Sequence, residues 1–387
     1  MSLANPRAPL WALGFRPFFL LAAAAAALLV ALWMFVYTGF LPPPPFFTAP
    51  LYWHAHEMIF GFAAAAIVGF LMTASQNWSG IRGIHGARLE TLAVVWLLGR
   101  LLPWVPMVPH WLYSLVDLSF LPAAAVLLAP YLGRKGRNAG LLGLLTLLTI
   151  GNLLVHLDAA GILPGLSHRG LLLGLDTILW VIIVIGGRII PAFTRNAVPH
   201  ANVRSYRWLD LLALASVGLY LILNFFFETS VVTALVAAAA AVINGARLAL
   251  WSPWQMRHNP MLAILGAGYS WMTLGFALTA CSHWHPLPPD VPLHAFAVGG
   301  IGCMIYGVMP RVSMGHTGRR IQASRWLAAG FVLVNLAAIL RVLSGALPEL
   351  RTNVLVSAAT VWVIAFTMFL VMFWPILTRP RLDGRPG

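Results

Sequence analysis

The chain has 387 residues, of which 60% are hydrophobic and only 9% are Asp, Glu, Lys or Arg. Soluble domains carry about a quarter charged residues, so a soluble chain of this composition would lack the polar side chains to cover its surface. The composition therefore excludes ordinary globular domains and disordered chains. A net charge of +14 would suit a nucleic-acid partner in a soluble protein, but the placement of the charges argues against that partner.

Long apolar segments predict an all-α polytopic membrane protein. A membrane-spanning helix needs about 20 mostly apolar residues. The first apolar run is longer than the ~7–15-residue core of a cleaved signal peptide, so we expect it to stay as a helix. No linker is long enough for a soluble domain, so residues 1–387 are expected to form a single helical-bundle domain. The twelve predicted spans, of which the third is short, are roughly 17–38, 51–75, 89–103, 110–131, 139–160, 168–190, 207–226, 231–251, 260–281, 291–310, 325–345 and 351–376.

The basic residues fall almost entirely on one side of this topology. If the chain alternates sides at each span, 20 Lys and Arg residues share the side of the N-terminus. The other side holds 4, namely Arg100, Arg169, Arg341 and Arg351. The positive-inside rule makes the first side cytoplasmic, with both termini inside. The net charge is then a consequence of topology, and nucleic acid is not an expected partner.

The second and tenth spans resemble each other at an offset of 238 residues. Identical residues recur within 27 residues and without a gap, which suggests duplicated units. The spans are eight helices apart, so internal four-helix repeats would fit. Chance matching between Gly-rich helices is the alternative. The identical pairs include His56 with His294, Gly61 with Gly299, Gly69 with Gly307, Ser75 with Ser313, Gly80 with Gly318 and Arg82 with Arg320.

Ionisable residues within the apolar spans gather in the outer third of the predicted bundle. Such residues are costly in a membrane and are usually functional. Neutral imidazole suits copper and haem iron, so the histidines are candidate metal ligands. The group comprises His54, His56, Glu57, Asp117, His156, Asp158, Asp176 and His294.

Spacing separates some of these candidates. His54 and His56 point about 200° apart on a regular helix, so they cannot easily bind one metal together. Asn152 lies one turn before His156 and could orient it. Glycines follow His294, and small residues admit either a neighbouring helix or a flat macrocycle. His316 lies about 33 Å along the helix from His294, in a basic stretch that could recognise an anion or lock a loop.

Three sequence blocks resemble the NnrS family. They are Leu13-Gly-Phe-Arg-Pro-Phe-Phe19, Trp53-His-Ala-His-Glu-Met58, and Arg311-Val-Ser-Met-Gly-His-Thr-Gly-Arg319. Their order and spacing extend over nearly the whole chain. The resemblance implies a twelve-helix bacterial inner-membrane protein with haem and copper, linked to nitric oxide and nitrosative stress. It also implies that His54 and His56 matter for the metals.

We therefore expect a haem–copper protein that reduces nitric oxide to nitrous oxide, with an unknown electron donor. His56 and His294 are the leading haem-ligand candidates, and His54 and His156 the leading copper candidates. No Cys-x-x-Cys-His site occurs, so the haem would be non-covalent and b-type. Glu57 is the candidate catalytic proton carrier, and Asn152 and Asp158 would support the ligands. A non-catalytic nitric oxide or metal binder, and a transporter of metal or small anions, remain alternatives.

Overall fold

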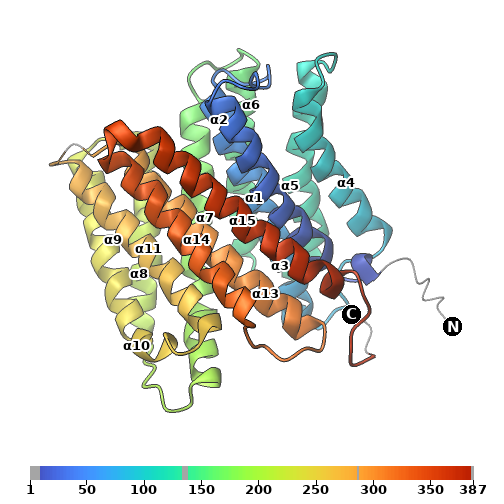
Figure 1. Ribbon diagram of the computed structural model, residues 1–387, viewed down its shortest axis with the longest axis vertical. Helices are drawn as coiled ribbons and strands as arrows, with labels where there is room; N and C mark the ends of the chain where they lie inside the picture. Colours follow the sequence, from blue (N-terminus) through green and yellow to red (C-terminus); the bar gives the residue numbers. More distant parts are fainter. Residues whose placement is uncertain (1–8, 133–137, 286, 385–387) are drawn as a thin grey trace. The chain divides into compact units, whose positions relative to one another are not determined.

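A computed structural model describes residues 9–132, 138–285 and 287–384, which form helices and connecting turns without a strand (Figure 1). This confirms the predicted all-α class. Elements η1, η3, η5 and η6 are short 3-10 helices, whereas η2 and η4 are π-helices. The elements are η1 (Pro9–Trp11), α1 (Phe15–Tyr37), α2 (Pro50–His56), η2 (Glu57–Ala63), α3 (Ala64–Ser79), α4 (Ala87–Leu101), η3 (Leu102–Trp104), α5 (His110–Leu132), α6 (Gly140–Ala159), α7 (Ser167–Ala197), α8 (Arg207–Phe227), α9 (Val231–Ala249), α10 (Pro253–Met256), α11 (Pro260–Ser282), α12 (Asp290–His294), η4 (Ala295–Gly302), α13 (Cys303–His316), α14 (Arg325–Leu343), η5 (Ser344–Ala346), η6 (Pro348–Leu350) and α15 (Arg351–Leu377).

Eleven helical segments of the described chain are long and apolar enough to cross a membrane. They correspond to all the predicted spans except the third. At that place the structure has α4, a helix of 15 residues, which is about 22 Å long against the ~30 Å of a bilayer core.

The first and last spans meet at one end of the protein. Arg16 at the start of α1 donates hydrogen bonds from one guanidinium nitrogen to the carbonyl oxygens of Leu377, at 2.9 Å, and Arg379, at 2.8 Å. Two ends on one side require an even number of crossings. The contact therefore fits eleven long spans with α4 as the twelfth crossing.

Local sequence explains where several helices begin and end. The Ala- and Leu-rich run of α1 consists of strong helix formers. Ser230, Asn259 and Ser324 cap α9, α11 and α14 by accepting a backbone N–H of the first turn. After α3, Gly80 takes a left-handed conformation (φ +72°), which ends the helix at low steric cost.

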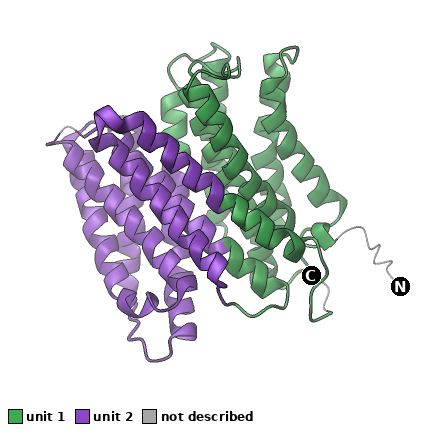
Figure 2. Ribbon diagram, viewed as in Figure 1, with its two compact units in different colours: residues 1–174, 309–321, 366–387 green, residues 175–308, 322–365 purple. Residues whose placement is uncertain are grey.

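The chain divides into two compact units (Figure 2). The first comprises residues 1–174, 309–321 and 366–387, and the second comprises residues 175–308 and 322–365. In the first, α1 packs on α3, and α5 packs on both α4 and α6; in the second, α11 packs on α9 and η4. The expectation of a single domain stays a prediction.

A π-helical segment interrupts the second and the tenth predicted spans at matching places. The segment η2 starts directly after His56, and η4 starts directly after His294. Both starts are separated by the same 238 residues as the sequence matches. π-Segments are uncommon and are frequent at functional sites, so this shared feature supports a relationship between the two spans, although larger four-helix repeats stay a prediction.

Candidate metal centre

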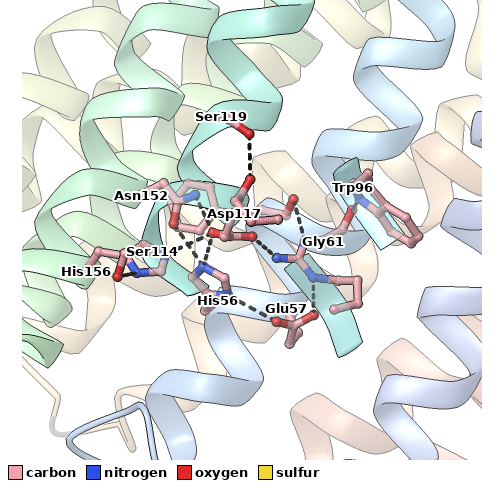
Figure 3. A network of polar contacts seen from close by, with 12 residues as sticks. His56, Glu57, Gly61, Trp96, Ser114, Asp117, Ser119, Asn152 and His156 are labelled. Atoms are coloured by element: carbon pink, nitrogen blue, oxygen red, sulfur yellow. Dashed lines mark hydrogen bonds and ion pairs between the residues drawn. The ribbon is translucent and has the colours of Figure 1, made fainter. Parts of the chain in front are cut away.

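A buried carboxylate, Asp117 on α5, collects side chains from three helices (Figure 3). One of its oxygens, Oδ2, lies 3.2 Å from Nε2 of His56 and 2.9 Å from Nε2 of His156. The same oxygen accepts a 2.8 Å hydrogen bond from the amide nitrogen of Asn152. His56, Asp117 and His156 offer ligand atoms that all lie within 4.8 Å of one another. The three residues thus form a candidate metal site.

The surroundings of His56 favour a positive charge. Its Nε2 faces two oxygen acceptors, Oδ2 of Asp117 and Oδ1 of Asn152, the latter at 2.9 Å. Its Nδ1 faces the Glu57 carboxylate at 3.2 Å. A neutral imidazole carries one N–H and cannot donate to both sides, so the ring matches these oxygens when it carries a second proton. A metal ion at Nε2 could take the place of that proton.

A second layer of side chains orients the two imidazoles. Glu57 faces the Nδ1 of His56, and the hydroxyl of Ser114 lies 2.9 Å from the Nδ1 of His156. Each contact engages one ring nitrogen and directs the other toward Asp117. Metal-binding histidines are commonly held in this way, by a carboxylate or another polar group on the second nitrogen.

Arg100 balances the acidic charge of the cluster. Its Nε lies 2.9 Å from Glu57, and another guanidinium nitrogen forms an ion pair with Asp117. All three side chains are buried. With both carboxylates ionised and both imidazoles neutral, the two negative charges and one positive charge leave a net charge of −1. A buried charge is unfavourable in an apolar setting, so the cluster favours a bound proton or metal cation.

Two side chains of α4 donate hydrogen bonds to the backbone of the π-segment η2. The indole nitrogen of Trp96 donates to the carbonyl oxygen of Gly61 at 3.1 Å, and Arg100 donates to that of Phe60 at 3.3 Å. Gly61 also leaves space for Arg100, because a Cβ there would lie 3.2 Å from two of its side-chain atoms. Backbone and side chains of the second span thus position the guanidinium between the two acids.

Glycines set the position of α6 against α7. A Cβ at Gly151 would lie 2.7 Å from the carbonyl oxygen of Gly170, and a Cβ at Gly170 would lie 2.5 Å from that of Gly151. The two backbones therefore touch at this point. Asn152 and His156 follow Gly151 on α6, so this contact limits how far the part of α6 that carries them can move toward α7.

The donor set fits a transition metal. The site offers two imidazoles and a carboxylate, with an amide oxygen nearby. Imidazole is a common ligand of copper, iron and zinc ions. Nitrogen-rich sites follow an affinity order that favours copper over its neighbours. The residues present are therefore compatible with copper, without selecting it over every other ion.

Two predicted site residues lie apart from this cluster. The ring of His54 stacks on Trp33 with centroids 4.7 Å apart, so it diverges from His56 as their spacing predicted. Asp158 accepts hydrogen bonds from the backbone N–H groups of Gly165 and Ser167, at 2.9 and 2.8 Å. It orders the turn before α7 and does not contact the candidate ligands.

His294 belongs to the other compact unit. Its Nδ1 lies 2.7 Å from the carbonyl oxygen of Asp290, so Nδ1 is the donor and Nε2 is the atom that could bind iron. Side chains of neighbouring helices occupy the space beside the glycines that follow His294. A Cβ at Gly299 would lie 2.4 Å from Trp271, and one at Gly302 would lie 2.6 Å from Trp362. These two glycines serve close packing, which was one of the two interpretations that the sequence left open.

Arg100 and Ser114 were not expected at the site, and Asp117 was expected at this depth without a role as a ligand. A signal for Arg100 existed, because it is one of four basic residues on the side that is otherwise poor in them. Asn152 was expected to orient His156, whereas it contacts His56 and Asp117.

Comparison with known proteins supports the resemblance seen in the sequence. The family model of NnrS proteins matches residues 9–381, which is nearly the whole chain. No curated protein matches the chain.

Proposed function

Because the chain belongs to the NnrS family, we propose that it binds haem and copper in the bacterial inner membrane and reduces nitric oxide to nitrous oxide. The family is associated with haem, copper and nitric oxide, and the apolar helices fit a lipid bilayer.

One observation carries the metal assignment. The Nε2 atoms of His56 and His156 converge on one oxygen of Asp117, and the three residues offer ligand atoms within 4.8 Å of one another. Copper is therefore proposed at these three residues, with Asn152 beside them. For haem we propose His294, in which Nδ1 would donate to the carbonyl oxygen of Asp290 and Nε2 would bind the iron.

A bound copper ion and haem would supply electron exchange and binding positions for nitric oxide, and holding two such molecules close together would lower the entropic barrier to their reaction. The protein residues supply the surroundings. Glu57 and Ser114 hold the imidazoles in position, and Arg100 compensates the carboxylates. Each pair of nitric oxide molecules takes up two electrons from an external donor and two protons, and yields one nitrous oxide and one water. Glu57, which contacts His56, is the proposed proton carrier. Nitric oxide is apolar enough to arrive through the bilayer, so no large substrate cleft is needed.

The first test measures metals and turnover on the same sample. Purified protein is analysed for copper and haem, reduced without oxygen, and given limiting nitric oxide while nitrous oxide is followed. Repeated loss of nitric oxide with nitrous oxide appearing supports the reductase. A stable nitrosyl spectrum without product contradicts turnover and favours a binder or sensor. Absence of both cofactors contradicts the proposal and favours a transporter.

A matched pair of variants tests the location. His156→Ala is expected to lose most of the copper, because it removes one of two imidazole ligands. His200→Ala, at an exposed loop histidine, is expected to keep it. Equal copper in both variants would place the metal elsewhere.

A further inference from the structure

A second cluster of polar side chains lies at the other end of the second span, where α1, α13 and the segment after α15 meet. The backbone N–H of Phe15 donates to the hydroxyl of Thr73 at 3.0 Å, and the rings of Phe15 and His316 have centroids 5.7 Å apart. Thr73 is 17 residues beyond His56, which corresponds to roughly 25 Å of helix. This cluster is therefore separate from the candidate metal centre.

The segment after α15 closes over the end of α13. The N–H of Leu382 donates to the carbonyl oxygen of Thr317 at 3.2 Å. Gly318, with φ +73°, lies so near Asp383 that a Cβ there would be 3.0 Å from its carboxyl carbon. The ring contact between Phe15 and His316 brings together two of the three sequence blocks that define the family resemblance.

Positive charge accumulates in this cluster. The charges of Arg381 and Arg319 both act on the guanidinium of Arg16. Burial and then the charge of Arg379 lower the pKa of Arg319. Arg16, Arg319, Arg379 and Arg381 carry positive charge in this region, and the carboxylate of Asp383 is bound by Arg381 at 2.6 Å.

Buried polar atoms in this region lack partners. Arg16 is only 1% exposed, and its Nε makes no hydrogen bond within the described chain. The hydroxyl of Ser313, one turn before His316 on α13, is fully buried and also has no hydrogen-bond partner there. Buried donors without a partner are unfavourable, so both atoms are suited to donate to a bound acceptor.

We propose that Arg16, Arg319, Arg381 and Ser313 form a binding site for a phosphate-type oxyanion at the end of the bundle where α1 begins. Guanidinium groups bind such anions through paired, charge-assisted hydrogen bonds, and a hydroxyl adds a further donor. The anion is either free phosphate or the phosphate of an anionic lipid, since membrane helices end here. The site does not rest on the proposed reaction with nitric oxide.

Binding is tested with inorganic phosphate titrated into the purified protein in a neutral detergent, at constant ionic strength set by chloride. Calorimetry is expected to show saturable binding for the wild type. Arg319→Gln and Ser313→Ala are expected to weaken it at least tenfold. Arg16→Gln is less suitable, because it also removes the hydrogen bonds to Leu377 and Arg379.

A lipid arm distinguishes the source of the anion. The protein is extracted from nanodiscs that contain phosphatidylcholine with a minor fraction of phosphatidylglycerol, and retained lipid is counted by native mass spectrometry. One retained phosphatidylglycerol that Arg319→Gln loses assigns the site to a lipid headgroup, whereas phosphate binding alone assigns it to a free anion. Either result supports the site.

The control is Arg257→Gln, which removes an exposed arginine from another predicted cytoplasmic loop. If it weakens binding as much as Arg319→Gln does, the effect is general charge and the site is refuted. Absence of both phosphate binding and lipid retention also refutes it. An unchanged elution volume in size-exclusion chromatography and an unchanged thermal transition check that each variant is folded. Because neither measurement depends on copper, failure of this site and failure of the metal centre can be told apart.

Discussion

Asp117 is the residue on which the candidate metal centre depends, because one of its oxygens meets both imidazoles. Asp117→Asn keeps the shape of the side chain but removes its charge and weakens it as a ligand. Copper content is expected to fall at least tenfold, measured by inductively coupled plasma mass spectrometry on purified protein. Glu349→Gln, at an exposed acidic residue, is the control. Full copper in the Asp117 variant would exclude the carboxylate as a ligand.

Arg100 serves stability as well as the site. Arg100→Gln leaves Glu57 and Asp117 buried without their counter-charge, and breaking such a pair costs about 3–5 kcal/mol. We expect a lower thermal transition in detergent than for Arg169→Gln, which removes an exposed arginine from the same predicted side. Adding Asp117→Asn to Arg100→Gln is expected to recover part of the loss, since one uncompensated charge is then absent. An unchanged transition in the single variant would show that the ion pairs contribute little.

Residue identities and depth were enough to select His56, Glu57, Asn152 and His156 from the sequence. Their partners were not predictable in the same way. Asp117 and Arg100 lie on separate helices, and whether two such side chains meet depends on how each helix is rotated about its axis. An apolar span facing lipid and neighbours on several sides carries little periodicity to fix that rotation.

At the level of elements, the contact between α6 and α7 can be tested with two glycines of one helix. At Gly143 a Cβ meets no atom within 4 Å, whereas at Gly151 it would meet the backbone of α7. Gly143→Ala is expected to be neutral or to stabilise by up to ~1 kcal/mol through helix propensity. Gly151→Ala is expected to destabilise by about 1–3 kcal/mol through overpacking.

The two variants also differ in their effect on the metal centre. Gly151→Ala should displace Asn152 and His156 and so lower copper affinity, whereas Gly143→Ala should leave it unchanged. Copper competition with a chelator of known affinity measures this directly. Similar affinities in both variants would show that the spacing of α6 and α7 does not set the geometry of the ligands.

Hydropathy does not predict the π-helical segments η2 and η4. The spans that contain η2 and η4 were found by hydropathy, which is insensitive to one additional residue in a turn. The sequence match between the two spans was the available signal, and the two π-segments start at matched positions of it. Hydropathy thus predicts that a helix crosses, whereas the direction of its side chains after His56 depends on the backbone.

For the whole molecule, the charge distribution and the helix lengths are two independent indications of the number of membrane crossings. The 20 to 4 division of basic residues assumes twelve crossings. Eleven described helices meet the length criterion, and α4, with 15 residues, does not. The hydrogen bonds of Arg16 to Leu377 and Arg379 place both ends of the bundle together, which an odd number of crossings would prevent. The predicted topology of twelve crossings therefore depends on whether α4 crosses the membrane.

Reporter fusions on the two sides of α4 decide this. We expect green fluorescent protein to be fluorescent when fused after Gly86 and after Gly384, because both positions are predicted to be cytoplasmic. Alkaline phosphatase is expected to be active only when fused after Pro106, beyond α4. If the fusion after Pro106 behaves like the one after Gly86, α4 does not cross the membrane and the charge division is wrong. If it crosses, the bilayer must be thinned or the helix ends extended at α4, because about 22 Å of helix has to bridge a core of about 30 Å. The basic residue near its end, Arg100, would then reach the outer side together with the metal ligands that it holds in place.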